Sequence, residues 1–297
     1  MNTTPSRIPN LLVTTLVLVF VLVVWGGVVR LSGSGLAIPD WPLAEGKVIP
    51  KPQINIWIEY IHRVLAGAVG LLTVGIAIAL FRHPVYRPRL GGHMWAALAV
   101  LGVQIFYGAR VVLEELPVDR VVTHLLLAFL FFAILLRMTL RAQDIEREEP
   151  RRGAVAGTRA LAAFSHAAAG VVFLQAGLGA WVSSSGAALA CPDFPTCHGS
   201  WFPKLEGLVG IHYTHRLGGY AVFLVVTALL LVAARAPLPP RARWPLRLAG
   251  VLVSLQVVLG IGNVVLGLPL VVSAGHLATA LMLFGTLLVA NHELARL

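Results

Sequence analysis

The sequence has little charge. Only 12% of its 297 residues are Asp, Glu, Lys or Arg, whereas a soluble domain usually carries about 25%. In contrast, 58% of the residues are hydrophobic, and the mean hydropathy is +0.83. This scarcity of charge excludes an ordinary soluble domain and predicts a polytopic membrane protein.

Acidic residues are scarcer still, with 13 Asp and Glu against 23 Lys and Arg. The basic residues gather in alternate connections, at 82–89, 137–153 and 235–247. Basic loops of membrane proteins stay on the cytoplasmic side. The net charge of +10 therefore indicates topology rather than a nucleic-acid partner, and it places the N and C termini in the cytoplasm.

Long apolar runs fill the rest of the chain. A membrane span needs about 20 apolar residues, and eight segments meet this requirement. The first is near full spanning length and lacks an A-x-A cleavage site, so it is predicted to be an uncleaved span rather than a signal peptide. The predicted spans cover roughly residues 10–30, 56–81, 92–113, 120–140, 160–183, 208–234, 245–266 and 271–292.

Cysteine is almost absent. Cys191 and Cys197 are the only two, and both lie in CPDFPTCHG, a loop predicted to face outward. In an oxidising compartment such a pair is expected to form a disulfide. A zinc or redox site would need further ligands, and His198 is the only neighbour of that kind. There is no C-x-x-C-H, so covalent c-type haem is not indicated.

The second half of the sequence repeats the first at an offset of 152 or 153 residues. IPDWPLAEGKVIPK (38–51) aligns with CPDFPTCHGSWFPK (191–204), and EYIHR (59–63) aligns with HYTHR (212–216). Self-similarity over half a chain is a signature of repeated architecture. The next matches are Gln104, Gly108, Pro117 and His124 with Gln256, Gly260, Pro269 and His276.

An even number of spans per half makes this internal repeat parallel. We therefore predict an all-α membrane protein whose eight transmembrane helices form two pseudo-symmetric four-helix bundles. The first half is residues 1–140 and the second is residues 160–297. Residues 141–159 form a polar cytoplasmic connector.

Each half carries one histidine early in its second span and one early in its fourth. At 1.5 Å per residue, all four should lie roughly 5–12 Å inside the outer boundary. Two histidines on facing helices can bind a haem iron from both sides, whereas two imidazoles per half are few for zinc or copper. A lone histidine in a span is often a simple helix contact, but ionisable groups in spans are by default functional. We predict haem ligation by His62, His124, His215 and His276.

An arginine follows the first histidine of each half. Arg63 and Arg216 are candidates for binding haem propionates, because guanidinium suits carboxylates. The alternative is snorkelling to lipid headgroups. Weaker candidates at the outer rim are Arg30, Arg110 and Arg120.

The halves differ at Glu59, which aligns with His212. Glu59 lies one turn from His62 on the same helix face. A carboxylate there can act as a general base or stabilise developing positive charge. The alternative is an ion pair with Arg63 or Arg110. We predict that the first half is reactive and that the second half transfers electrons.

These motifs resemble the haem A synthase family, and the resemblance covers nearly the whole chain. It rests on RLSGSGL (30–36), PDWP (39–42), EYIHR, CPDFPTCHG, HYTHR and the positions of His124 and His276. It implies conversion of haem O to haem A by oxidation of a ring methyl group to a formyl group. The implied location is the cell membrane, with both haem sites near the extracytoplasmic side.

The resemblance also assigns residues. His215 and His276 are implied as ligands of haem b, His62 and His124 as ligands of the substrate haem O, and Glu59 as the essential carboxylate. Many bacterial members carry a second cysteine pair in the first outward loop, where this chain has Ile38 and Ala44, so a mechanism that needs a thiol there does not apply. The implied partners are a haem O-forming farnesyltransferase and an electron acceptor.

Two other functions fit parts of the pattern. A di-haem b-type cytochrome that relays electrons from quinol without modifying haem would use the same histidines, although it needs no acid beside one haem. A transporter with an internal repeat is disfavoured because Pro117 and Pro269 fall in loops rather than in broken helices. The electron acceptor, the source of the formyl oxygen and a homo-oligomeric state are left open.

Overall fold

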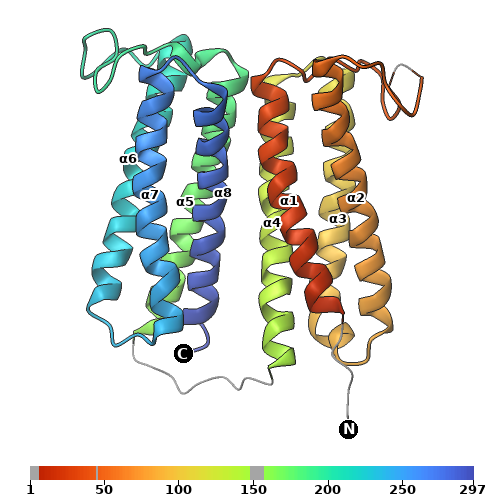
Figure 1. Cartoon of the computed structure of the whole chain (residues 1–297). Coiled ribbons are helices and arrows are strands. Elements are labelled where there is room, and N and C mark those ends of the chain that lie inside the picture. Colours follow the sequence, from red (N-terminus) through yellow and green to blue (C-terminus); the bar gives the residue numbers. More distant parts are fainter. Residues whose placement is uncertain (1–6, 45, 148–156) are drawn as a thin grey trace. The chain divides into compact units, whose positions relative to one another are not determined.

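The computed structural model describes residues 7–44, 46–147 and 157–297, which are almost entirely helical (Figure 1). The described residues form eight long α-helices and one short 3-10 helix, with no β-strand, and this confirms the all-α prediction. The elements are α1 (Ile8–Leu31), α2 (Ile54–Arg82), α3 (Tyr86–Leu113), α4 (Val118–Glu146), α5 (Thr158–Ser184), η1 (Ala187–Leu189), α6 (Gly207–Ala234), α7 (Pro240–Val265) and α8 (Leu270–Leu294).

Each of the eight α-helices is long and apolar enough to cross a membrane. A helix satisfies its backbone hydrogen bonds internally, as hydrocarbon surroundings require. Large apolar side chains face outward along the helices, among them Leu71 on α2, Leu174 on α5 and Val271 on α8. Such surfaces suit lipid better than water, and the prediction of a multi-pass membrane protein is confirmed.

Two helices extend six residues beyond their predicted spans, and α7 begins five residues early, at Pro240. The α3 helix begins at Tyr86 rather than near residue 92, and α4 continues to Glu146 rather than ending near residue 140. Hydropathy marks only the apolar part of a helix, whereas backbone hydrogen bonding continues into polar turns. The Tyr86 hydroxyl donates to Glu146 Oε1 at 2.5 Å and joins these two extensions. The predicted connector is correspondingly shorter, and its residues 148–156 lie outside the described part of the chain.

The chain divides into two compact units. The first takes in the described residues of Met1–Leu116 and Leu127–Pro150, and the second takes in those of Pro117–Leu126 and Arg151–Leu297. This division differs from the predicted boundary between residues 140 and 160, because the beginning of α4 groups with the second unit. Its Leu126 side chain lies against Gly177 of α5, where an added Cβ would come within 3.3 Å.

Polar contacts fix the helix pairing of the second unit. Ser165 on α5 donates to the carbonyl oxygen of Leu287 on α8 at 2.8 Å. One turn further toward the same end of the pair, Asn291 Nδ2 donates to the carbonyl oxygen of Ala162 at 2.8 Å. Interhelical hydrogen bonds of this kind hold helices together where lipid supplies no hydrophobic driving force. They set the register of α5 against α8.

Candidate functional site

His62 lies two turns into α2, with its imidazole against α1. An added Cβ at Gly26 of α1 would lie 2.9 Å from His62 Cε1, which is closer than packed carbon atoms approach. Only glycine therefore leaves room for the ring. Beside this contact, Trp25 Nε1 donates to the carbonyl oxygen of Ile58 at 2.9 Å and joins the same two helices. The α1 helix thus determines where the His62 ring lies.

His215 on α6 repeats this packing against α5. An added Cβ at Gly179 would lie 3.1 Å from His215 Cε1. Gln175, one turn earlier on α5, adds polar contacts: its Nε2 lies 2.9 Å from His215 Nδ1 and donates to the His215 carbonyl oxygen at 2.7 Å. The position and orientation of the His215 ring are therefore fixed by both a glycine and an amide.

His276 on α8 is held in the same way by α7. An added Cβ at Gly260 would lie 3.2 Å from His276 Cε1. Gln256 Nε2 lies 3.2 Å from His276 Nε2. His276 Nδ1 is buried and has no hydrogen-bond partner. Buried polar nitrogen atoms are rarely left in that state, so this atom points to a ligand.

The second unit contributes two imidazoles, the donor type that haem iron takes. In each ring one nitrogen lies beside a glutamine side-chain amide, and the other is His215 Nε2 or His276 Nδ1. For the second nitrogen to bind a metal, the first must carry the proton and donate it to the glutamine oxygen, so the amide oxygen has to face the ring. Such outer contacts orient histidine ligands in metalloproteins. The glycines at positions 179 and 260 keep the rings close to the neighbouring helices. Two imidazoles held in one unit are the donors that the predicted haem site needs, and ligation of a haem iron by His215 and His276 stays a prediction.

His124 lies in the second turn of α4 and is half-buried. Its segment groups with the second unit, whereas His62 belongs to the first. Ligation of one haem by His62 and His124 therefore stays a prediction.

Glu59 is buried, with 3% of its surface exposed. Its Oε1 accepts a hydrogen bond from Arg63 Nη2 at 2.6 Å, and its Oε2 accepts one from the backbone N–H of Ile38 at 2.8 Å. The ion pair with Arg63, which the sequence left open, is thus present. The carboxylate joins α2 to the loop that precedes it.

Arg63 reinforces the same connection. Its guanidinium donates to the carbonyl oxygens of Ile38 at 2.7 Å, Asp40 at 2.6 Å and Leu43 at 2.9 Å. Together with Glu59, these acceptors use four of the five N–H donors of an arginine. The predicted contact with a haem propionate is untested, but the observed contacts make Arg63 an anchor of the loop.

Two of the weaker arginine candidates pair with nearby acids. Arg110 forms an ion pair with Glu114, and Arg120 forms one with Asp119 at 2.6 Å. Ion pairs this exposed contribute little stability. They give no support for haem binding by either arginine.

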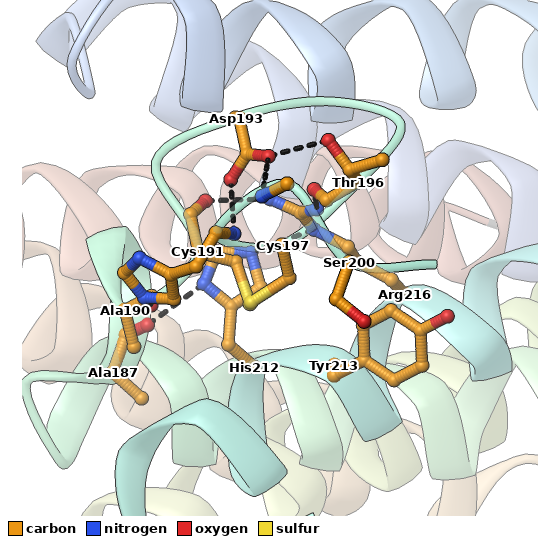
Figure 2. Close-up of a disulfide and its surroundings, with 12 residues drawn as sticks. Ala187, Ala190, Cys191, Asp193, Thr196, Cys197, Ser200, His212, Tyr213 and Arg216 are labelled. Carbon is orange, nitrogen blue, oxygen red and sulfur yellow. Dashed lines mark hydrogen bonds between the residues drawn. A yellow bond between two sulfur atoms is a disulfide. The ribbon is translucent and has the colours of Figure 1, made fainter. Parts of the chain in front are cut away.

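The loop between α5 and α6 is closed by the Cys191–Cys197 disulfide, which confirms the predicted bond (Figure 2). Arg216 anchors this loop as Arg63 anchors the first. Its Nη2 donates to the Cys191 carbonyl oxygen at 2.6 Å and its Nη1 donates to that of Thr196 at 2.8 Å. Haem propionate binding by Arg216 likewise stays a prediction.

His212, which aligns with Glu59, is also part of the anchor (Figure 2). It is buried, and its Nδ1 lies 2.8 Å from the carbonyl oxygen of Ala187. Its Nε2 accepts a hydrogen bond from Arg216 Nε at 3.1 Å. Both ring nitrogens therefore have protein partners, and His212 is not a metal ligand in this arrangement.

An aspartate organises the turn of each loop. Asp193 accepts hydrogen bonds from the Thr196 hydroxyl and from the backbone N–H groups of Gly199 at 2.9 Å and His198 at 2.7 Å. These bonds, the Thr196 one foremost, hold the pKa of the Asp193 carboxyl well below its usual range. In the first loop, Asp40 Oδ2 accepts from the backbone N–H of Gly46 at 2.9 Å.

The contacts between glycines and histidines were not predicted from the sequence, although the sequence contains a signal for two of them. Gly26 and Gly179 are separated by the same offset as the histidines that they contact, His62 and His215. Aligning the first spans of the two halves would have found this pair. Gln175 gives no such signal, because position 22 of the first half is leucine.

Comparison with known proteins gives consistent matches. The model of the COX15-CtaA family, described as a cytochrome oxidase assembly protein, matches residues 9–56 and 51–288. The haem A synthase of Shewanella oneidensis is 31% identical over 96% of this chain and 96% of its own length. The haem A synthase of Rhizorhabdus wittichii is 28% identical over 98% of this chain and 94% of its own length, and that of Nitrosospira multiformis is 30% identical over 94% and 91%. These matches confirm the predicted resemblance, and the chain belongs to the COX15-CtaA family of cytochrome oxidase assembly proteins.

Proposed function

We propose that this protein is a haem A synthase, an oxidoreductase that converts a ring methyl group of haem O to a formyl group. The observation that carries the proposal is the similarity to haem A synthases along nearly the full length of both chains. The histidines packed against glycines supply what such an enzyme needs, namely fixed imidazoles within membrane spans. The product would serve assembly of a terminal oxidase.

In this proposal the second half holds haem b. His215 and His276 would hold its iron, and Gln175 and Gln256 would orient their rings. Haem b supplies one-electron chemistry when bound, so this half would remove the electrons released by oxidation of the substrate. The buried Nδ1 of His276 supports a ligand at this position.

The first half holds the substrate. His62 and His124 would fix haem O by its iron, and Glu59 would lie one helical turn from His62, near the porphyrin edge. Both oxygens of the Glu59 carboxylate already accept hydrogen bonds, from Arg63 and from the Ile38 N–H. The carboxylate is thus held in one orientation, with both oxygens already engaged. We therefore favour stabilisation of positive charge on the substrate over proton abstraction.

We further propose that the halves, residues 1–140 and 160–297, arose as a parallel internal repeat with both termini cytoplasmic. Three features support the repeat: the shared offset of the glycine–histidine contacts, an arginine anchor in each loop and an aspartate in each turn. The distribution of basic residues supports the topology. In this topology the haem sites would lie near the extracytoplasmic side of the cell membrane.

Haem extraction tests the proposed activity. The protein is produced in a host that makes haem O and lacks its own haem A synthase, and the extracted pigments are separated by chromatography. Haem A should accumulate only when the protein is present. A relay cytochrome, the second candidate, would leave haem O unmodified while the purified protein still contained haem b. Supply by a haem O-forming farnesyltransferase and the identity of the electron acceptor stay predictions.

A further inference from the structure

We propose that the tips of the two anchored loops insert into the interfacial layer of the lipid bilayer beside the protein. The first tip is Val48–Ile49 in the loop between α1 and α2, and the second is Trp201–Phe202 in the loop between α5 and α6. The partner is a phospholipid surface, with the apolar side chains at the boundary between headgroups and acyl chains. This inference does not depend on the haem chemistry.

The tips are the most exposed apolar parts of these loops. Val48 and Ile49 are 74% and 68% exposed, and Trp201 and Phe202 are 62% and 91% exposed. Two adjacent, large and exposed apolar residues mark an interaction site more often than isolated ones do. The two pairs align with each other at the offset of 153 residues, so both loops present the feature at one position.

A hydrogen-bonded turn precedes each apolar pair. Backbone hydrogen bonds between Ala44 and Lys47 close a tight turn directly before Val48, and those between Cys197 and Ser200 close the corresponding turn directly before Trp201. The hydroxyl of Tyr213 on α6 donates to the carbonyl oxygen of Trp201. These turns and the Tyr213 contact fix the backbone beside the apolar pairs, whose side chains are exposed.

The tips lie at the level of a membrane boundary. The α2 helix begins at Ile54 and α6 begins at Gly207, a few residues after each tip, and both helices are candidate spans. In Figure 1 each loop extends sideways from the helix ends of its own unit. A segment in that position meets the surface of the surrounding lipid.

The residue types also fit an interface. Aromatic side chains such as that of Trp201 are enriched where headgroups meet hydrocarbon. Pro-Lys follows each tip, and the ammonium groups of Lys51 and Lys204 can reach phosphate while their stems stay in apolar surroundings. Glu206 is the acidic residue near the second tip, and Lys47 adds a cation near the first. A lipid partner accounts for both the apolar pairs and the lysines that follow them.

Site-specific labelling tests the proposal. The two native cysteines are bonded to each other, so a single introduced cysteine is the only free thiol. Ile49→Cys and Phe202→Cys carry a polarity-sensitive fluorophore, and the intact protein is reconstituted in phosphatidylcholine vesicles with and without phosphatidylglycerol. Leu71→Cys, on the exposed face of α2, is the lipid control, and Arg147→Cys, beyond the end of α4, is the water control.

Quenchers report the surroundings of each label. We expect a quencher attached near the lipid headgroup to reduce the emission at both tips about twofold more than at Arg147→Cys, with weaker quenching by aqueous iodide. If iodide quenches the tips as strongly as the water control, the tips lie in water and the proposal is wrong. Protection from both quenchers would mean that a second copy or another protein covers the tips, which also overturns it. If the headgroup quencher acts on the tips only in vesicles that contain phosphatidylglycerol, the lysines and not the apolar pairs hold the tips at the membrane, and the proposal is wrong.

Discussion

Arg63 and Arg216 show how one residue type can organise a loop from within a helix. Each guanidinium donates to two or more backbone carbonyl oxygens of the preceding loop, and each also contacts the side chain four residues earlier, Glu59 or His212. The planar fork of arginine matches several acceptors at once. The loops above the proposed haem sites are thereby tied to the helices that carry His62 and His215.

Arg63→Lys tests this anchoring role. Lysine keeps the charge but cannot serve all four acceptors, so buried acceptors lose their partners at a cost of about 1–3 kcal/mol. We expect faster amide hydrogen exchange in residues 38–44 and a lower midpoint of thermal unfolding in detergent. Arg87→Lys, at an exposed position on α3, is the matched control and should change neither quantity. Unchanged exchange in Arg63→Lys would show that the loop does not depend on the fork.

Glu59→Gln separates charge from anchoring. The amide oxygen can still accept from the Ile38 N–H, whereas the negative charge and the bond from Arg63 Nη2 are lost, because an amide nitrogen cannot accept. Arg63 keeps its three carbonyl acceptors in the loop. If that charge stabilises the reacting substrate, haem A formation should fall about 100-fold or more. Amide exchange in residues 38–44 should change little, and the haem content should stay normal. Full haem A production at normal haem content would contradict the catalytic role.

Gly179→Ala tests the packing of a proposed haem ligand. The added Cβ would lie 3.1 Å from His215 Cε1, so the ring must move. Overpacking of this kind costs about 1–3 kcal/mol, and we expect purified protein to carry several-fold less haem b with altered low-spin electron paramagnetic resonance signals. Gly170→Ala, on the same helix with open space around it, is the control. Equal haem content and identical signals in both variants would exclude the positioning role.

At the scale of elements, the two loops reach similar shapes by different means. The second loop is closed by the Cys191–Cys197 disulfide. In the first loop the same positions are Ile38 and Ala44, which are buried and pack in a cluster with Ile56. Burial of apolar side chains stabilises this loop where a covalent bond is missing. The first loop therefore keeps a shape similar to that of the second loop without thiols.

The Cys191→Ser, Cys197→Ser double variant tests what the disulfide contributes. The bond closes a separation of six residues, and a loop of that size is worth about 2 kcal/mol in the chain-entropy model. We expect a lower unfolding midpoint with haem A formation retained, since Arg216 still holds the loop. Complete loss of haem A formation in a folded, haem-loaded variant would instead assign a redox role to the pair.

The helices follow from hydropathy, but their ends and contacts do not. Hydropathy located all eight spans, yet it missed the polar first turns of α3 and the last turns of α4, because helical hydrogen bonding continues past the apolar segment. The histidines and the disulfide could be predicted from spacing. The shared offset would have identified Gly26 and Gly179 as a pair, but only the structure shows that they contact His62 and His215. The sequence offered an ion pair for Glu59 as an alternative, and the structure contains it.

At the scale of the whole molecule, the two units have the same kinds of parts but different polar residues beside their histidines. His215 has Gln175, whereas the aligned position in the first half is Leu22. The helix face near His215 carries His212, whereas that near His62 carries Glu59. These differences suit different roles for the two haems. In the central claim, the haem of the second half transfers electrons and that of the first half is the substrate.

The absorption spectrum of the purified protein, taken together with haem extraction, tests this claim most directly. The wild type should show a six-coordinate, low-spin haem in its Soret and α bands. The His276→Ala variant should lose the haem b signal and keep the pigment bound by the first half. The His62→Ala variant should keep haem b, lose the pigment of the first half and form no haem A. A protein without Soret absorbance, or one whose spectrum and extracted pigments are unchanged in both variants, would contradict the account.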